Sequence, residues 1–199
     1  MIYRWFNPDL SYAGYIGENE IDEIAMCWSS PILGDPLPPL SQWRAPTLTQ
    51  YVGDNSHKLS KIIADCVSSG SMLLINQKSV DALADIWAKH ATLYPVILDD
   101  LPNEPYYMVV VNTVIDCIDR EKSNGNINED TLHGKKGLFN GIKQWVFRED
   151  EIGNNEMFVL PDSASVIYVT EIFKQQVIEA GLTGYGFVTQ LYDDNPIIT

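Results

Sequence analysis

The chain has 199 residues, 45% hydrophobic and 20% charged, which is the composition of a globular protein with a sizeable core. Its 13 Lys and Arg residues against 27 Asp and Glu residues give a formal net charge of −14. Phosphate backbones bind basic surfaces, so this charge argues against direct nucleic-acid binding. The start lacks the features of a signal peptide, and no apolar run is long enough to cross a bilayer. We therefore expect a soluble, cytoplasmic protein without membrane contact.

The acidic residues gather in two places. Between Arg4 and Arg44 the sequence has no Lys or Arg. A solvated surface explains such clusters, but acidic patches also suit a basic protein partner or mimicry of a phosphate backbone. The candidate partner-binding residues are Glu18, Glu20, Asp22 and Glu23 in the first cluster and Glu149, Asp150 and Glu151 in the second.

The N-terminal residues 1–55 are expected to be an extended, acidic segment of the same domain as the α+β part, residues 56–199. Residues 1–6 alternate weakly and are expected to form an edge strand. The proline-rich stretch PILGDPLPP, residues 31–39, forbids a regular helix or central strand and predicts a loop.

A helical pattern begins at Ser56, with apolar residues on one face up to Val67 and Gly70 as its end. Residues 72–75 follow as a short buried strand. Ser79 is then expected to cap a second helix whose apolar stripe is Val80, Leu83, Ala84 and Trp87.

The second half is rich in strand patterns. The longest candidate spans residues 106–115, and a polar loop is expected over residues 121–141. Further strands are expected at 144–148, 157–160, 166–169 and 185–191. Thr170 should cap a helix that Gly181 ends in a left-handed conformation, with Leu182 in the apolar position of a Schellman turn. The pattern predicts an α+β fold, with a mixed or mainly antiparallel sheet and helices packed on one face.

The three cysteines Cys27, Cys66 and Cys117 are an odd number in apolar neighbourhoods, which favours buried free thiols over a disulfide. No nucleophile elbow, phosphate-binding loop, zinc-protease motif or paired-cysteine motif is present, so we expect no cofactor. His57, His90 and His133 are far apart in the sequence and are expected to be surface or capping residues.

Asp116 and Asp119 are the best catalytic candidates. On a helical turn the two carboxylates would share a face and could bind a divalent cation together with Glu121. In the alternative interpretation, Asp116 caps a turn where the strand ends, and Asp119 is solvated. A hard metal needs more carboxylates than this segment offers, so the structural interpretation is favoured and no metal is expected.

Three segments resemble a known family in their order and spacing: YYMVVVNTVIDCIDREKS (106–123), KQWVFRED (143–150) and VIYVTEIFKQQVIEAGLTGYGF (166–187). They are similar to bacterial immunity proteins from polymorphic toxin systems, immunity family eleven, formerly a domain of unknown function. The resemblance extends over about residues 70–190. The matching positions are Asn112, Asp116, Asp119, Lys122, Ser123, Phe147, Arg148, Val169 to Lys174, Gly181 to Gly184 and Phe187.

The resemblance implies a non-enzymatic protein that binds and neutralises a cognate toxin in the cytoplasm of the producing cell. It makes Asn112, Asp116, Asp119, Gly181 and Gly184 structural motif residues, while partner specificity should come from the variable surface. Two alternatives stay open: a small metal-dependent hydrolase that uses Asp116, Asp119 and Glu121, and a general interaction or regulatory domain.

Overall fold

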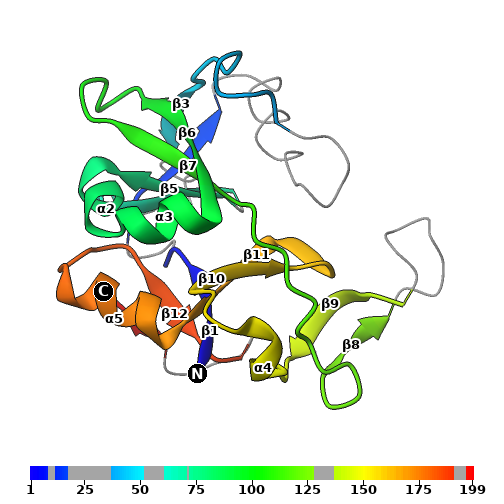
Figure 1. The fold of residues 1–199 in the computed structure, drawn as a ribbon. Coiled ribbons are helices and arrows are strands. Elements are labelled where there is room, and N and C mark those ends of the chain that lie inside the picture. The colour runs from blue at the N-terminus through cyan, green and yellow to red at the C-terminus, as the bar shows by residue number, and fades with distance from the viewer. Residues whose placement is uncertain (9–11, 18–36, 52–60, 71, 128–136, 191–195) are drawn as a thin grey trace, which may run out of the picture.

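The computed structural model describes residues 1–8, 12–17, 37–51, 61–70, 72–127, 137–190 and 196–199. Its strands form a closed barrel, a five-stranded sheet and a two-stranded sheet. The barrel lies at one end of the molecule and the five-stranded sheet at the other, with short helices between and beside them (Figure 1).

The barrel contains six strands in the order β2-β3-β6-β7-β5-β4. Its interior is filled by small, aliphatic and aromatic side chains such as Leu48, Leu74 and Tyr106, each of which is almost fully buried. This is expected of a barrel of this size, in which inward residues alternate with outward ones and fill the centre. The strands are β2 (Gly14–Gly17), β3 (Thr47–Tyr51), β4 (Cys66–Ser69), β5 (Met72–Asn76), β6 (Ala91–Leu98) and β7 (Tyr106–Val111).

The five-stranded sheet has the order β10-β11-β1-β12-β13, so the first strand of the chain lies in its centre and the prediction of an edge strand at residues 1–6 is wrong. β1 pairs antiparallel with both β11 and β12. The strands are β1 (Ile2–Phe6), β10 (Met157–Leu160), β11 (Ser163–Thr170), β12 (Gly186–Val188) and β13 (Ile197–Ile198).

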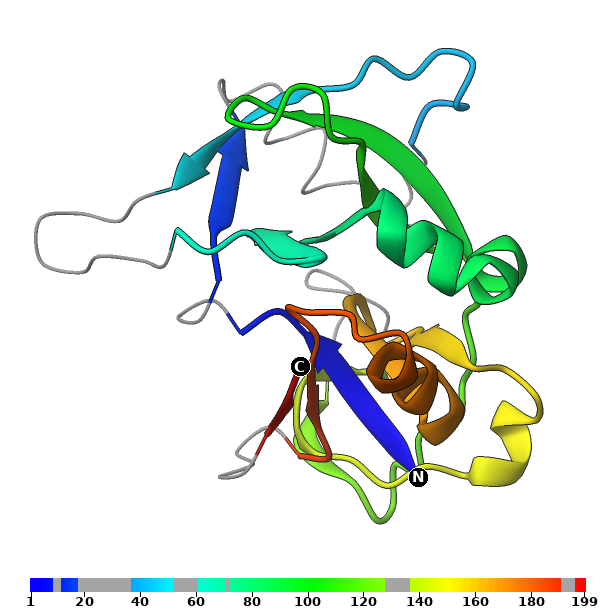
Figure 2. The same ribbon diagram turned by 90° about the vertical axis from the view of Figure 1, so that its left-hand side faces the viewer.

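One core joins the barrel to this sheet. Trp5 of β1 stacks on Tyr185 and packs against Trp87 and Phe173, with ring centroids 5.2, 6.0 and 5.5 Å away. Trp87 lies in α3 (Ala84–His90), which follows α2 (Gln77–Ala82), and Phe173 lies in α5 (Glu171–Glu179). Figure 2 shows α2 and α3 at the barrel and α5 beside the five-stranded sheet. The barrel and the sheet therefore share a hydrophobic core.

A second core lies on the other side of the five-stranded sheet. Phe158 and Tyr168 contribute to it from the sheet, and Ile118, Trp145 and Phe147 contribute from the connecting segments. The same region carries α4 (Glu149–Ile152) and the two-stranded sheet of β8 (Asn124–Ile127) and β9 (Phe139–Gln144). This ribbon extends outward from the body of the molecule (Figure 1).

The structure corrects several sequence predictions. The helix predicted from Ser56 to Gly70 is wrong where it is described: residues 66–69 form the fully buried strand β4, and Gly70 lies in the β4–β5 turn with φ +59°. Apolar runs buried on both faces do not distinguish a strand from a helix by periodicity alone. Ser79 is not the helix cap either, because the side chain of Asn76 accepts the Ser79 amide hydrogen.

Other strand boundaries also differ. The strand predicted for 106–115 ends at Val111. Of the strand predicted for 144–148, only Gln144, which ends β9, and Phe147, which bridges to Ile118, are paired. Residues 91–98, for which no strand was predicted, form one of the longest strands. The strands expected at 72–75, 157–160 and 166–169 are confirmed.

The fold is mostly β with a few short helices and a mixed, mainly antiparallel strand pairing. Parallel pairs occur only where β2 meets β4 and β3 meets β6 among the described ladders. The prediction of one sheet with helices on one face missed the barrel, because barrel closure depends on pairing between strands distant in the sequence.

Candidate functional site

The residues that carry the family motifs meet in a structural unit that we call the motif clasp, residues 116–123 and 145–148. Ile118 and Phe147 form an antiparallel bridge. The Asp119 amide donates to the Val146 carbonyl at 2.8 Å, and the Arg148 amide donates to the Cys117 carbonyl at 2.7 Å. The two segments of the clasp are therefore held together by main-chain hydrogen bonds over the second core.

Arg148 closes the clasp with its side chain. Its Nη1 donates to the Ile118 carbonyl at 2.9 Å, and its Nη2 donates to the Asp116 carbonyl at 2.6 Å. Ser123 closes the other end, because its Oγ accepts from the Val146 amide at 2.9 Å. These two side chains satisfy main-chain groups that strand pairing leaves free, which is a structural role.

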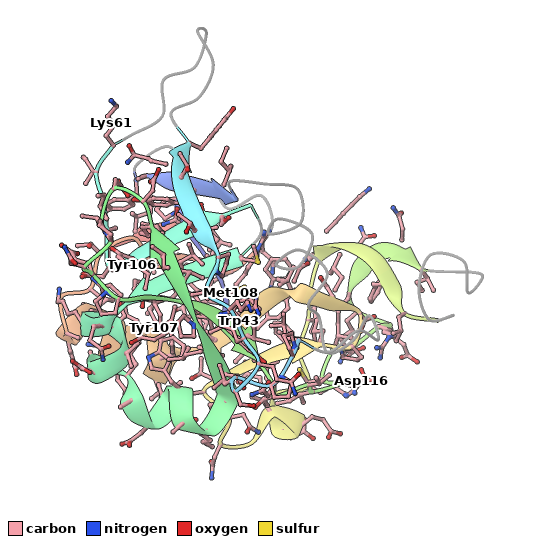
Figure 3. All side chains as sticks on the ribbon, turned by 90° about the horizontal axis from the view of Figure 1, so that it is seen from above. Trp43, Lys61, Tyr106, Tyr107, Met108 and Asp116 are labelled. Carbon is pink, nitrogen blue, oxygen red and sulfur yellow. The ribbon has the colours of Figure 1, made fainter. Side chains whose placement is uncertain are left out.

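Asp116 is an exposed residue of the clasp. Its side chain is 55% exposed and pairs with Arg120 Nη1 at 2.8 Å. The other nitrogen of Arg120, Nη2, pairs at 2.8 Å with Asp162, whose side chain is completely buried. Asp162 also accepts from the Phe139 amide at 2.6 Å, so Arg120 and Asp162 fix the β9 ribbon to the clasp. Figure 3 shows Asp116 well apart from Tyr106 and Met108 of the barrel.

Asp119 is the capping residue of this segment. Its Oδ1 accepts from the amides of Glu121 and Lys122, each at 3.2 Å, and its Oδ2 lies 2.9 Å from Lys122 Nζ. The hydrogen bond from the Lys122 side chain is the main cause that lowers the pKa of Asp119. The sequence predicts that Asp116 caps the turn and that Asp119 is solvated. In the structure Asp119 is the cap and Asp116 is the exposed residue.

The two carboxylates bind different cations, Arg120 and Lys122, instead of facing one shared position. Within the described ranges, no three His, Cys, Asp or Glu side chains group as metal ligands would. Burial raises the pKa of the Cys117 thiol to about 12, so this cysteine is protonated at neutral pH and is no ready nucleophile. His57 and His133 lie outside the described residues. This geometry gives no support to a metal-dependent hydrolase at Asp116, Asp119 and Glu121.

The Gly-Leu-Thr-Gly motif, residues 181–184, ends α5 in the predicted Schellman turn. Gly181 has φ +58°, its amide donates to the Ile178 carbonyl, and the Leu182 amide donates to the Val177 carbonyl. Gly184 has φ +83° and lies against the main chain of Cys66. The turn therefore both ends a helix and contacts the barrel strand β4.

Asp65 is the centre of this contact, and no sequence motif points to it. It accepts hydrogen bonds from Asn76 Nδ2, Lys78 Nζ and the Thr183 amide at 2.9 to 3.0 Å. Although burial works in the opposite direction, the hydrogen bonds from Asn76, Lys78 and Thr183 lower the pKa of Asp65. Lys78 also donates to the Gly181 carbonyl at 2.8 Å, so one ion pair joins α2, the chain before β4 and the motif turn.

A second polar contact between the barrel and the sheet involves His90, which is buried, with 1% of its surface exposed. Its Nδ1 lies 2.9 Å from Thr113 Oγ1, and its Nε2 lies 2.8 Å from Glu156 Oε2. Lys89 Nζ also lies 2.8 Å from that Glu156 oxygen. Although burial opposes it, hydrogen bonding from Lys89 and His90 lowers the pKa of Glu156 to about 2. The prediction of His90 as a surface or capping residue is wrong, because the side chain is buried and contacts Glu156. Residue type alone does not reveal a partner 66 residues away.

The second acidic cluster is exposed on the surface. Glu149, Asp150 and Glu151 form the first turn of α4, and their side chains have no hydrogen-bond or ion-pair partner among the described residues. The bonds from Arg148 to residues 116–118 bring this turn close to Asp116. Glu18, Glu20, Asp22 and Glu23 lie outside the described residues. Asn112, another motif residue, donates from Nδ2 to Thr92 Oγ1 at 2.9 Å.

The clasp and the turn at 181–184 both fall within residues 79–191, which match the model of an immunity protein family, Imm11. The chain belongs to this family. Membership in Imm11 indicates a toxin-neutralising immunity function and supports the resemblance inferred from the motifs. No individually characterised protein matched the chain significantly in sequence.

Several parts of this Imm11 protein lie outside the matched residues. Asp65, Cys66 and the barrel strands β2 and β3 precede residue 79.

In the part of the chain that the structure describes, no helix is long and apolar enough to span a membrane.

Proposed function

We propose that this protein neutralises a cognate toxin by direct, non-enzymatic binding in the cytoplasm of the producing cell. The observation that carries the proposal is the Imm11 match, which covers residues 79–191. The geometry of the motif residues supports it: Asp116, Asp119 and Arg148 each bind other groups of the same chain. These motif residues therefore stabilise the fold, which leaves the surface to select the toxin.

We further propose that the toxin presents a basic surface. The formal net charge of −14 attracts a cationic partner over long range and raises the association rate at low ionic strength. Glu149, Asp150 and Glu151 are exposed and would contribute to this attraction. The acidic residues Glu18, Glu20, Asp22 and Glu23 are proposed to act in the same way.

Survival of a sensitive host tests the function. The probe is a candidate cognate toxin: the C-terminal domain of a large secreted protein whose gene is found next to that of this chain, expressed from an inducible promoter. Co-expression of the immunity protein should restore growth, and an unrelated acidic protein of similar size should not. Death of the host at equal expression of both proteins would count against the proposal, as would equal rescue by the control.

A further inference from the structure

The outer surface of the barrel has two unlike halves. Side chains that point outward from β5 and β7 are buried in the core shared with the five-stranded sheet; they are Leu73, Ile75, Val109 and Val111. The strands β2 and β3 and the end of β6 contribute no outward side chain to that core. In Figure 1, β3 lies on the side of the barrel away from the five-stranded sheet.

We call the outward side chains of this second half the open barrel face. Antiparallel pairing sets Ile16 beside Thr49, and parallel pairing sets Thr47 beside Ile97. Directly paired residues point to the same side of a sheet, as do residues two apart on one strand. One continuous outward surface therefore crosses three strands and is formed by the side chains of Ile16, Thr49, Thr47 and Ile97. Tyr51 lies on the same side of β3 and extends this surface. Ile16, Ile97 and Tyr51 are 40, 39 and 44% exposed.

The open barrel face is uncharged, but its edge is acidic. The Asp99 amide donates to the Leu48 carbonyl of β3, and the Asp100 carboxylate accepts from the Tyr15 hydroxyl of β2 at 3.1 Å. Glu104 is exposed in the same loop. Two described basic residues lie near these strands. Arg44 comes shortly before β3. Lys61 lies at the end of the barrel opposite to Asp99 and Asp100, where the neighbouring Ile62 carbonyl accepts from the Ala13 amide. Figure 3 shows Lys61 at the periphery of the molecule.

We infer that the open barrel face is the surface on which the toxin docks, an inference that rests on the proposed function. An exposed β-branched and aromatic centre with an acidic edge fits a partner that inserts apolar side chains and surrounds them with basic ones. The acidic clusters elsewhere accelerate the encounter, and this face slows dissociation. β2 and β3 also lie outside the family-matched residues 79–191, where a surface specific to one partner belongs.

Charge selects this occupant over a second copy of the chain. Another copy would bring a second net charge of −14 against the face. Like charges across an interface oppose association, whereas a basic toxin surface is attracted to Asp99, Asp100 and Glu104.

The test compares two double variants in binding to the purified toxin domain that the immunity protein neutralises in the survival assay. Ile16→Arg with Ile97→Arg puts two cations on the face and should weaken the affinity at least about 30-fold, chiefly through faster dissociation. The matched control, Ile172→Arg with Ile178→Arg, changes two isoleucines of α5 that are 58 and 43% exposed. It should stay within about threefold of the parent. Equal affinities for the parent and the face variant would overturn the inference.

Hydrogen exchange on the unmodified complex keeps the test independent of folding defects. Protection should appear in residues 14–17, 47–51 and 95–99 on toxin binding. Protection confined to residues 114–121 and 148–152 would place the toxin elsewhere and contradict the inference. If the parent protein forms a dimer, and the face variant loses the dimer but keeps its affinity for the toxin, the occupant of this face is a second copy of the chain. If the parent fails to bind the toxin at all, the proposed function itself is wrong.

Discussion

Gly184 lies directly against the main chain of Cys66, so closely that a Cβ at position 184 would overlap the Cys66 carbonyl oxygen. The same Cβ would lie 2.7 Å from that of Ala64. Asn7 is placed on the same contact, because its Nδ2 donates to the carbonyls of both Cys66 and Gly184. The last motif glycine is therefore where the C-terminal part of the fold meets the barrel.

Substitution of the two motif glycines should separate their roles. Gly181→Ala places a Cβ in open space at φ +58° and should lower the free energy of unfolding by about 1 kcal/mol. Gly184→Ala adds the overlap with Cys66 to a similar strain and should cost at least about 3 kcal/mol. Urea denaturation measures both. Equal losses in the two variants would show that the contact with Cys66 has no energetic weight.

The two aspartates of the clasp should differ in the order opposite to the one expected from the sequence. Asp116→Ala removes an exposed ion pair and should cost under about 1 kcal/mol, because Arg120 keeps Asp162. Asp119→Ala removes the acceptor of two main-chain amides and should destabilise more. Asp119→Asn, which keeps an oxygen acceptor, should recover part of that loss. A lower melting temperature for Asp116→Ala than for Asp119→Ala would contradict these assignments.

Stability should depend on Glu156 in the acid range. The pKa of Glu156 is lowered to about 2 in the folded state, against 4.5 for the unperturbed group. As the pH falls, the folded protein therefore binds this proton at a lower pH than the unfolded chain does. Its stabilisation is therefore complete above about pH 4.5 and is lost as the pH falls towards 2.

Glu156→Gln should consequently destabilise by about 2 kcal/mol at pH 7, and its deficit should shrink at pH 3. Glu149→Gln, on the exposed turn of α4, is the control and should follow the parent at every pH. A Glu156→Gln deficit that stays constant between pH 7 and pH 3 would rule out the ionised carboxylate as its source.

Charge reversal on α4 tests the electrostatic part of the account. Glu149→Lys, Asp150→Lys and Glu151→Lys together should slow toxin association about tenfold at low salt and flatten its salt dependence. The control reverses Asp81, Asp85 and Glu179, which are also exposed and lie on the other helices. Both variants change the net charge by the same amount, so an equal loss of association rate would indicate a global effect of charge and no local patch.

The parts of the fold that sequence predicted are those fixed by local chemistry. Gly181 could be placed because a helix end needs a left-handed residue, and Leu182 because the turn returns an apolar side chain to the core. The strands at 72–75, 157–160 and 166–169 were found because short apolar runs between turn residues are typical of buried strands.

Long-range contacts set the limits of that prediction. β4 was mistaken for the end of a helix because Cys66 and Val67 are buried by strands and a motif turn that are distant in the sequence. His90 and Glu156 are 66 residues apart and neither belongs to a recognisable motif, so the contact between their side chains could not be inferred. The motif residues were located correctly, but their roles could not be: Asp119 caps the turn only because residues 145–148 hold that segment in place.

The most direct test of the central claim is a titration of toxin activity with the purified immunity protein, monitored together with complex formation. Toxin activity should fall linearly and reach zero at one equivalent, with a one-to-one complex that survives gel filtration and releases active toxin on denaturation of its partner. Inactivation by far less than one equivalent, or full toxin activity in the presence of excess immunity protein, would contradict direct, non-enzymatic neutralisation.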